Sequence, residues 1–532
     1  MIGRPPIGRV LPWLLAAALI VVSVRFGRQL QRDSPEVFLG AAPLVGQNLR
    51  DGWDWRFGWG LVGAGIVAAS VVWSIWTRRW STLSIRTVVA VTALAAGAFA
   101  VLLALTDGRK GLLLGADHET EYLANLDIIP GAREFIRSFV TDIDRYSVHV
   151  RGHPPGFLLI LDGFDAIGLV GAWPVVALSL AATMLLPVAV LIAIRIVADD
   201  AWVRRVAPLL AFSPYALWMM TSADAVFAAC GAWAVTTCLL ALRSSGRIAV
   251  AWGVLSGLLL GALLFMTYGG ATFTIVLVVP TVVAWRRRRA GVVPAVVGVA
   301  VATAAVTAVF LVLGFWWLDG ARETQRQYWA GTAQFRPFGY FMIANLAVAL
   351  IAIGPIGFAG LVEFWRHRKP PPAVWPLVVG AVLALLVSHL SQYTRAEIER
   401  IWLLFYPWLM VAAGVPALTS RPRVLAASWR CRPVLRSCCK RPWCRSGDRL
   451  SAVRPAVDRP SRATAHDGTP PCPRRTPPRR GNPAGRSPAA GWRTHDGCRR
   501  GGIRRPPSAE AHPRDATPRP CPAPSVAYRC TR

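Results

Sequence analysis

Residues Gly111–Leu161 read GLLLGADHETEYLANLDIIPGAREFIRSFVTDIDRYSVHVRGHPPGFLLIL and form the long polar interval of an otherwise apolar region. Apolar segments precede and follow this stretch, so its placement decides on which side of the fold every later connection lies. Its charged and histidine side chains include Asp117, Glu119, Glu121, Asp127, Asp142, Asp144, His149, Arg151 and His153. Because ionisable groups are sparse in the flanking segments, we expect any chemistry to occur here.

The composition predicts a membrane protein. Hydrophobic residues make up 54% of the 532 residues, and the mean hydropathy is +0.42. Soluble globular domains contain about 45–50% apolar residues. We therefore predict an all-α, polytopic membrane protein over residues 1–418.

The last part of the chain, residues 419–532, differs from the rest. It holds 26 of the 59 Lys and Arg residues but 6 of the 28 Asp and Glu residues, and it is rich in Arg, Pro and Cys. This composition is typical of a disordered tail and also of a GC-rich gene translated out of frame, so both interpretations stay open. Its cysteine spacing matches no zinc or disulfide framework. Because most of the net charge of +31 lies in this tail, we predict no nucleic-acid partner.

Apolar runs long enough to cross a bilayer recur through the first 418 residues, and we predict about twelve transmembrane helices. They cover Val10–Val24, Gly58–Trp76, Thr87–Thr106, Trp173–Val197, Val206–Thr221, Ala223–Leu242, Ile248–Tyr268, Ala271–Trp285, Val292–Trp317, Phe341–Phe364, Ala373–Leu390 and Ile401–Leu418.

The segment Phe157–Val170 (FLLILDGFDAIGLV) decides the orientation of these helices. It is short and carries Asp162 and Asp165, which would be costly at the bilayer midplane. Basic clusters occur in later connections at Arg204/Arg205, Arg243/Arg247, Arg286–Arg289, Arg366/Arg368/Lys369 and Arg421/Arg423. All of them face the cytoplasm if Phe157–Val170 lies along the interface, and all face outward if it crosses. The positive-inside rule favours the first arrangement, so residues 107–172 are predicted as a large extracytoplasmic loop with juxtamembrane helices.

The acids of this loop suit glycosyl transfer to an alcohol. A carboxylate takes the acceptor proton while the sugar carbon becomes oxocarbenium-like, and a cation holds the departing phosphate. Asp117, Glu119 and Glu121 supply the carboxylates, and Arg151 and His153 lie further along the same loop. Solvated acids in an aqueous loop remain the alternative interpretation.

Two further motifs face the same side. Pro154–Pro155 predicts a rigid helix start that fixes the residues preceding it. The late stretch Gln392–Trp402 contains Glu399 and Arg400, and an arginine there can hold a lipid phosphate or simply anchor the next helix at the interface. The pair Asp142 and Asp144 matches a short metal-binding pattern that is too common to assign.

These residues resemble the GT-C superfamily, the polytopic glycosyltransferases that use polyprenyl-phosphate sugars, including protein mannosyltransferases and aminoarabinose transferases. The resemblance is carried by the acidic cluster with Tyr122, by HVRGHPPGFLLIL at His149–Leu161, and by Glu397–Phe405. The last two are similar to motifs of a group of actinobacterial membrane proteins of this type. The acidic stretch follows the third predicted helix rather than the first, which departs from the family layout.

The resemblance implies an inverting transferase that moves mannose or arabinose from a polyprenyl-phosphate donor to an envelope glycan, lipid or protein. The implied base is one of Asp117, Glu119 or Glu121. The implied substrate-binding residues are Tyr122, Arg151, His153, Glu399 and Arg400. A need for Mg²⁺ or Mn²⁺ stays open, with no metal ligand assigned. The alternatives are a transporter or flippase of lipid-linked intermediates and a non-catalytic envelope protein.

Overall fold

The structure is a computed structural model. It describes residues 7–34, 36–37, 39, 44–45, 57–220, 222–366 and 373–415. The chain divides into two units, Met1–Ser437 and Cys438–Arg532, and the second lies wholly outside the described residues. The predicted tail at 419–532 therefore also lies outside the described part of the chain.

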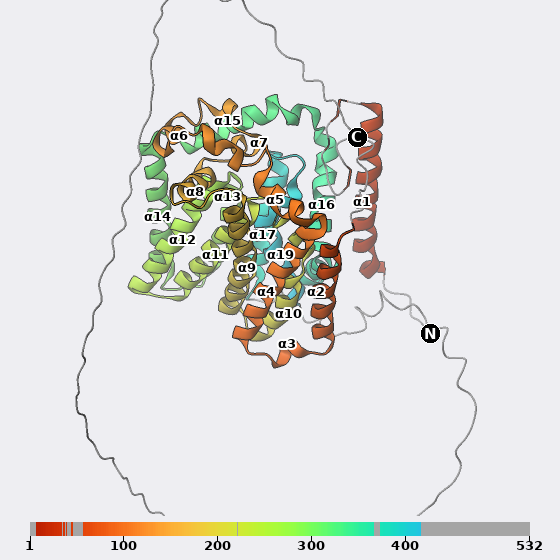
Figure 1. Ribbon diagram of the computed structural model, residues 1–532. Coiled ribbons are helices and arrows are strands. Elements are labelled where there is room, and N and C mark those ends of the chain that lie inside the picture. Colours follow the sequence, from red (N-terminus) through yellow and green to blue (C-terminus); the bar gives the residue numbers. More distant parts are fainter. Residues whose placement is uncertain are drawn as a thin grey trace, which may run out of the picture. The chain divides into compact units, whose positions relative to one another are not determined.

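The described residues build an all-helical fold without a β-sheet. Among them, nine helices are long and apolar enough to cross a membrane, so the prediction of an all-α, multi-pass membrane protein is confirmed at this level. They are α1 (Ile7–Asp33), α2 (Trp59–Trp76), α4 (Ile85–Ala104), α9 (Ala172–Val197), α11 (Asp224–Arg243), α12 (Gly246–Met266), α13 (Gly269–Arg286), α14 (Val292–Val312) and α16 (Phe338–Arg366) (Figure 1). Helix α4 continues through a 3₁₀ turn, η1 (Leu105–Asp107), into α5 (Gly108–Asp117).

The other three predicted spans are not long helices. The last apolar helix, α17 (Trp375–Ser391), has 17 residues. The predicted span 206–221 is broken, because α10 (Asp200–Ala211) ends before Pro214, where η4 (Pro214–Trp218) begins. Proline disfavours helical geometry in the residue before it, and Ser213 is extended, so α10 does not continue into η4.

The predicted span 401–418 is also broken over its described residues. It consists of α18 (Ile398–Ile401), η6 (Trp402–Leu404), α19 (Tyr406–Met410) and η7 (Val411–Gly414). Pro407 lacks the N–H that a continuous helix needs. Residues 402–415 are buried, and irregular backbone at membrane depth is tolerated where protein surrounds it.

Residues 107–172 contain, besides α5, a series of short helices. They are η2 (Leu123–Ile128), α6 (Ala132–Ser138), η3 (Ile143–Arg145), α7 (Val148–Arg151) and α8 (Gly156–Ala166). Helix α8, at the predicted interfacial position, has 11 residues. At about 1.5 Å per residue it is too short for a hydrocarbon core of about 30 Å. Its placement on a membrane stays a prediction.

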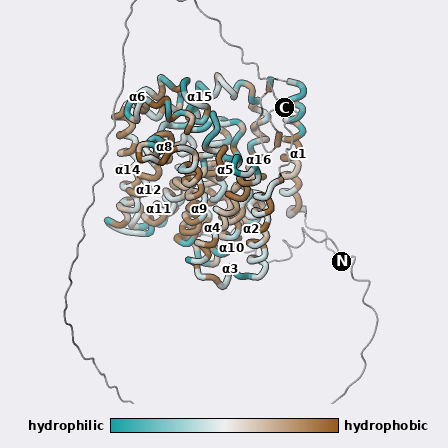
Figure 2. Tube along the Cα trace, in the orientation of Figure 1, coloured by the Kyte–Doolittle hydropathy of each residue, from teal (hydrophilic) through white to brown (hydrophobic). Residues whose placement is uncertain are grey.

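Polar segments gather at one end of the long helices. Helix α15 (Trp317–Ala330), followed by η5 (Thr332–Phe335), lies beside α6 and α7 at the upper end in Figure 1, and hydrophilic residues colour this end in Figure 2. Thr324 on α15 donates a hydrogen bond of 2.9 Å to the carbonyl oxygen of Arg151. The predicted catalytic loop and the later connection 317–337 therefore form one layer.

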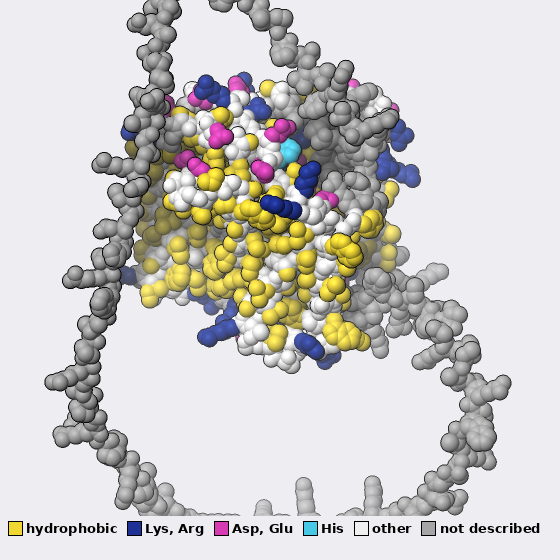
Figure 3. All heavy atoms as spheres, viewed as in Figure 1, with side chains coloured by type: hydrophobic (Ala, Val, Ile, Leu, Met, Phe, Trp, Pro, Cys, Tyr) yellow, Lys and Arg dark blue, Asp and Glu magenta, His cyan; other side chains and the backbone are white. Residues whose placement is uncertain are grey.

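Basic connections lie at the opposite end. The turn with α3 (Arg79–Thr82) is at the bottom of Figure 1, and Arg204 donates to the carbonyl oxygen of Trp80 there. Arg243 lies near enough to Arg287 and Arg289 to be repelled by them, so two more basic connections are neighbours. Figure 3 shows a broad apolar surface between the two polar ends, as expected for helices that cross a bilayer.

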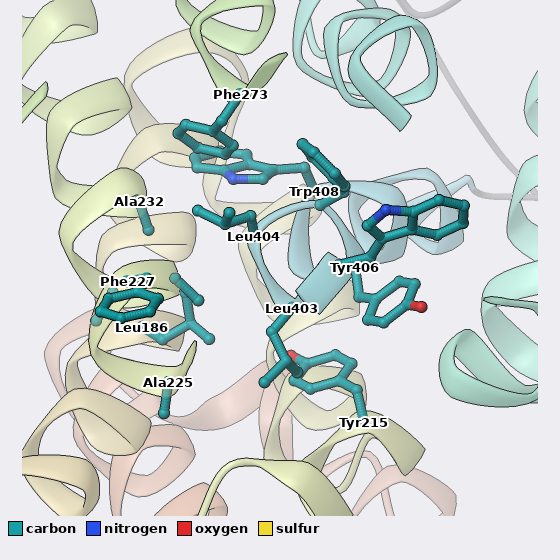
Figure 4. Packing of buried hydrophobic residues seen from close by; sticks show 14 of the residues in the cluster. Leu186, Tyr215, Ala225, Phe227, Ala232, Phe273, Leu403, Leu404, Tyr406 and Trp408 are labelled. Atoms are coloured by element: carbon teal, nitrogen blue, oxygen red, sulfur yellow. The ribbon is translucent and has the colours of Figure 1, made fainter. Parts of the chain in front are cut away.

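The buried core lies beneath the polar layer. Tyr406 and Trp408 of α19 are fully buried, and the Tyr406 ring stacks on Tyr215 with centroids 6.4 Å apart (Figure 4). Phe273 of α13 stacks on Phe405 in the same region. The short helices after Ile398 are thus held from several sides, which fixes the residues that precede them.

Candidate active site

A cavity of about 470 Å³ opens within the polar layer. It is bounded by α7, the start of α13, α15, the end of α17 and the turn that leads into α18. Its aromatic wall consists of Tyr268, Trp317, Tyr328, Tyr393, Trp402 and Phe405. The lining also contains six charged or histidine side chains: His149, Arg151, His153, Arg336, Glu397 and Arg400. The cavity therefore combines an apolar wall with ionisable groups.

Arg400 is the centre of this charged cluster. Its Nη1 donates to Asp224 at 2.9 Å, and its Nη2 donates to Glu397 at 2.6 Å and to Nε2 of His149 at 3.0 Å. Burial alone would lower the pKa of Arg400, but the carboxylates of Glu397 and Asp224 outweigh it and raise that pKa above its ordinary value. Arg400 therefore stays charged and joins α18 to α7 and α11.

Glu397 is held by two arginines. Besides Arg400, the buried Arg336 donates to it at 3.0 Å. The Glu397 side chain nevertheless keeps 37% of its surface exposed and lines the cavity. Burial would raise the pKa of this carboxyl group, yet Arg400 and Arg336 hold it well below its usual range. Glu397 is thus an ionised and weakly basic carboxylate.

The turn that presents Glu397 has an unusual backbone. Ala396 and Glu397 both adopt positive φ, at 70° and 58°, and Gln392 does so at 49°. Such left-handed conformations are uncommon for residues other than glycine and cost free energy. The buried ion pairs of Glu397 supply the fixed contacts that keep the turn in this conformation.

Glu121 and His149 form a second pair. Nδ1 of His149 lies 2.8 Å from Oε1 of Glu121, a close approach rather than an aligned hydrogen bond. Glu121 is buried with 6% of its surface exposed, whereas His149 lines the cavity. Asn125 supports the loop because its side chain donates to the carbonyl oxygen of Glu121 at 2.9 Å. Of the three predicted catalytic acids, Glu121 is therefore the one connected to the cavity.

Asp117 and Glu119 lie elsewhere. Asp117 is the last residue of α5, Glu119 follows in the turn, and both are exposed. Neither lines the cavity. The structure thus separates two of the predicted acids from Glu121, although the sequence places all three within five positions.

His153 and Tyr122 pack beside this pair. Nδ1 of His153 lies 2.8 Å from the carbonyl oxygen of His149, and a carbonyl oxygen only accepts, so Nδ1 carries the proton. Burial lowers the pKa of His153 to about 4. The ring is therefore neutral near pH 7 and offers Nε2 as an acceptor. Tyr122 is buried against Phe157, and burial raises the pKa of its hydroxyl group well above the ordinary value.

Arg151 is the unpaired cation of the lining. It lies partly buried at the end of α7. Within the described residues, its guanidinium group makes no hydrogen bond or ion pair, while Arg336 and Arg400 are both bound to Glu397. Arg151 can therefore bind an anion without giving up an ion pair that the described residues show.

Glu399 is not part of the cavity lining. Only 6% of its surface is exposed, and among the described residues no hydrogen bond reaches its Oε2. Burial raises the pKa of Glu399 to about 8, and the neighbouring Glu397 adds to the rise. This carboxyl group is protonated near pH 7, which suits a buried supporting role.

The described residues do not gather a metal site. No group of three or more His, Cys, Asp or Glu side chains in this part of the chain is arranged to hold a metal ion. Asp142 pairs with Arg145 at 3.7 Å, and Asp144 accepts a hydrogen bond from Gln327. Because these two acids have separate partners, they do not fit a shared Mg²⁺ or Mn²⁺ ion, and we derive no step through a metal.

Four residues of the cluster were not among the predicted site residues: His149, Asp224, Arg336 and Glu397. Glu397 carries a local signal, because it lies three positions before Arg400 in the sequence and pairs with it. The others come from distant parts of the chain, so their meeting depends on tertiary packing.

Comparison with protein-family models gives no match to this sequence. Comparison with curated proteins gives none either. The cavity and its residues are therefore the basis for assigning a function.

Proposed function

We propose that the protein is a membrane glycosyltransferase that moves mannose or arabinose from a polyprenyl-phosphate donor to an envelope glycan, lipid or protein. The observation that supports this most is the cavity, whose lining combines aromatic side chains, an Arg151 without an ion-pair partner among the described residues, and a fixed cluster of Arg400, Glu397 and His149. A polyprenyl-phosphate sugar needs an apolar surface for its lipid, a cation for its phosphate and polar groups for its sugar.

The donor's parts match the parts of the cavity. Arg151 holds the phosphate, because a guanidinium group binds phosphate oxygens with paired hydrogen bonds. The aromatic wall, which includes Tyr268 and Trp317, contacts the sugar ring and the first isoprene units. Arg400 stays bound to Glu397 and Asp224 and organises the cluster. His153 accepts a hydrogen bond from a sugar hydroxyl group instead of supplying charge.

The chemical step is a single displacement with inversion at the anomeric carbon. The acceptor oxygen bonds to that carbon, the bond to the phosphate oxygen breaks, and the electron pair leaves with the polyprenyl phosphate. Arg151 balances the charge that develops on the departing phosphate. Glu121, connected to the cavity through His149, is the loop acid that supports proton removal from the acceptor.

The cavity faces the extracytoplasmic side in this proposal. The basic connections with Arg204, Arg243 and Arg287 lie at the other end of the long helices. Cytoplasmic connections carry an excess of Lys and Arg. The loop at residues 107–172 and α15 then meet the donor outside the cytoplasm.

The test uses the purified full chain in detergent with radiolabelled polyprenyl-phosphate mannose or polyprenyl-phosphate arabinose and octyl α-mannoside as the acceptor probe. We expect label to move from the donor to the probe or to water. Glu121→Gln should lower this rate more than Asp117→Asn or Glu119→Gln does. Failure of the wild-type chain to cleave either donor contradicts the proposal, and unchanged transfer after alanine replacement of all three acids contradicts the role of the loop.

A further inference from the structure

We propose that His149 is the group that takes the proton from the acceptor hydroxyl, and that Glu121 positions it. This inference rests on the proposed glycosyl transfer and deepens it. In this scheme a loop carboxylate does not remove the proton itself. It orients the histidine that does.

None of the nearby carboxyl groups combines access with basicity. Glu397 lines the cavity, but two arginine hydrogen bonds stabilise its charge. Asp224 is buried and accepts from Arg400 and from Ser222 at 2.8 Å. Glu121 and Glu399 are each 6% exposed and neither lines the cavity. A general base must reach the proton that it removes. Asp224, Glu121 and Glu399 are therefore excluded as the base.

His149 meets both conditions. It lines the cavity, and its ring is held between Glu121 and Arg400. The guanidinium group only donates, so Nε2 of His149 accepts, and the ring proton of the neutral form lies on Nδ1. Nδ1 is the nitrogen beside Glu121. The pair therefore has the tautomer that leaves a lone pair on Nε2, at the nitrogen that reaches the cavity cluster.

The Arg400 hydrogen bond marks where the hydroxyl group binds. Nη2 of Arg400 is 3.0 Å from Nε2 of His149 and 2.6 Å from Glu397. The acceptor hydroxyl replaces the longer of these two hydrogen bonds, while the shorter one and the Asp224 contact keep Arg400 in place. The hydroxyl hydrogen then points at Nε2 and the oxygen lone pair is free to attack.

The acceptor oxygen forms a bond to the anomeric carbon as its proton moves to Nε2 of His149, and the anomeric bond to the phosphate oxygen breaks with its electron pair. The ring becomes an imidazolium ion between Glu121 and Arg400, and the Glu121 carboxylate stabilises it. Loss of that proton to water in the cavity restores the neutral ring.

The experiment separates proton removal from other roles by changing the nucleophile. Azide has no proton to lose, so a variant without its base can still form a glycosyl azide from the same donor. We compare wild type, His149→Ala, His149→Gln and Glu121→Gln as full chains in detergent with radiolabelled polyprenyl-phosphate mannose or polyprenyl-phosphate arabinose. His118→Gln is the matched control, because His118 is exposed in the same loop and does not line the cavity.

We expect both His149 variants to lose about 100-fold or more of the transfer to octyl α-mannoside, and azide to raise donor cleavage by His149→Ala at least about tenfold. Glu121→Gln should lose about 10- to 100-fold, as orienting residues do. His118→Gln should match wild type. Size-exclusion profiles identify variants that fail to fold. If His149→Ala fails to fold, the loss of transfer is measured with His149→Gln, which keeps a polar side chain of similar length.

The pH profile provides a second readout. Ionisable groups that face His149 directly or through Arg400 are Glu121, Tyr122, Arg151, His153, Asp224, Glu397 and Arg400. Transfer by wild type and azide-dependent cleavage by His149→Ala should differ in their pH profiles, because only the first reaction needs Nε2 of His149 to take up a proton. If wild type transfers the sugar and the His149 variants do so at a nearly equal rate, the role of His149 is wrong. The same holds if azide does not raise donor cleavage by His149→Ala. Both outcomes leave the proposed glycosyl transfer standing. An inactive wild type overturns the proposed function instead.

Discussion

Arg400 donates a hydrogen bond of 2.9 Å to Asp224, although 176 positions separate the two residues in the chain. Both side chains are largely buried, at 15% and 7% exposed. The contact joins α18 to the first residue of α11 and holds Arg400 in the lining of the cavity. The geometry of the cluster therefore depends on this ion pair.

Removing one partner of the pair should destabilise the fold. Arg400→Gln leaves Asp224 buried without its counter-charge, and Asp224→Asn leaves Arg400 with one carboxylate fewer. Breaking a buried pair costs about 3–5 kcal/mol, and the double variant should lose less than the sum of both. The unfolding midpoint of the detergent-solubilised chain measures this. Arg195→Gln is the control, since its pair with Asp200 is half exposed; an equal loss there would contradict the prediction.

The stability of the protein should fall between about pH 5 and pH 8 because of Glu399. Its pKa is raised from 4.5 to about 8 by burial, so the folded state keeps a proton that the unfolded state releases. The stabilisation from this proton is complete below the unfolded pKa and is lost as pH rises through the folded one. Glu399→Gln should raise the unfolding midpoint at pH 8 and change it little at pH 5. Parallel midpoint curves for wild type and variant would refute this.

Arg151 should control donor affinity. Its guanidinium group is the lining cation without an ion-pair partner among the described residues, so Arg151→Gln removes the phosphate contact and leaves the Arg400 cluster intact. We expect KM for the polyprenyl-phosphate donor to rise about tenfold or more, consistent with the loss of a charged hydrogen bond. Arg145→Gln is the control, because Arg145 is 74% exposed in the same loop. Steady-state rates over a range of donor concentrations measure this KM. An unchanged KM would exclude a contact between Arg151 and the donor phosphate.

The long helices could be predicted from hydropathy because each is an uninterrupted apolar run. The breaks could not. Val292–Trp317 reads as one apolar run, yet α14 ends at Val312, where Gly314 takes a φ of 100° before α15 starts. Likewise, Pro407 interrupts an apolar segment whose residues are buried by protein rather than lipid. Hydropathy reports apolarity and length, and it does not report what surrounds a helix.

The site was predictable only in part. The sequence identified Glu121, Arg151, His153 and Arg400 through their charge in apolar surroundings, and all four lie at or next to the cavity. It could not distinguish Glu121 from Asp117 and Glu119, because that difference comes from which side chain turns toward His149. Arg336 and Asp224 approach Glu397 and Arg400 across 61 and 176 positions, a distance over which local patterns carry no information.

The packing of α12 against α14 gives a last prediction. The sequence places Gly253, Gly257 and Gly261 four positions apart on α12, a spacing that lets membrane helices approach closely. A methyl group at Gly253 would lie 2.6 Å from the carbonyl oxygen of Ala295 on α14. Backbone atoms cannot rotate away, so Gly253→Ala must push the two helices apart.

We expect Gly253→Ala to cost about 1–3 kcal/mol, the usual penalty of overpacking, and to lower the unfolding midpoint in detergent. Gly65→Ala on α2 is the matched control, because no atom lies within 4 Å of a methyl group there and alanine is the better helix former by about 1 kcal/mol. Both substitutions add one methyl group to a glycine within a helix. A lower unfolding midpoint for Gly253→Ala than for Gly65→Ala therefore reports the contact between α12 and α14. Equal midpoints would mean that α12 and α14 are not held together by this close approach.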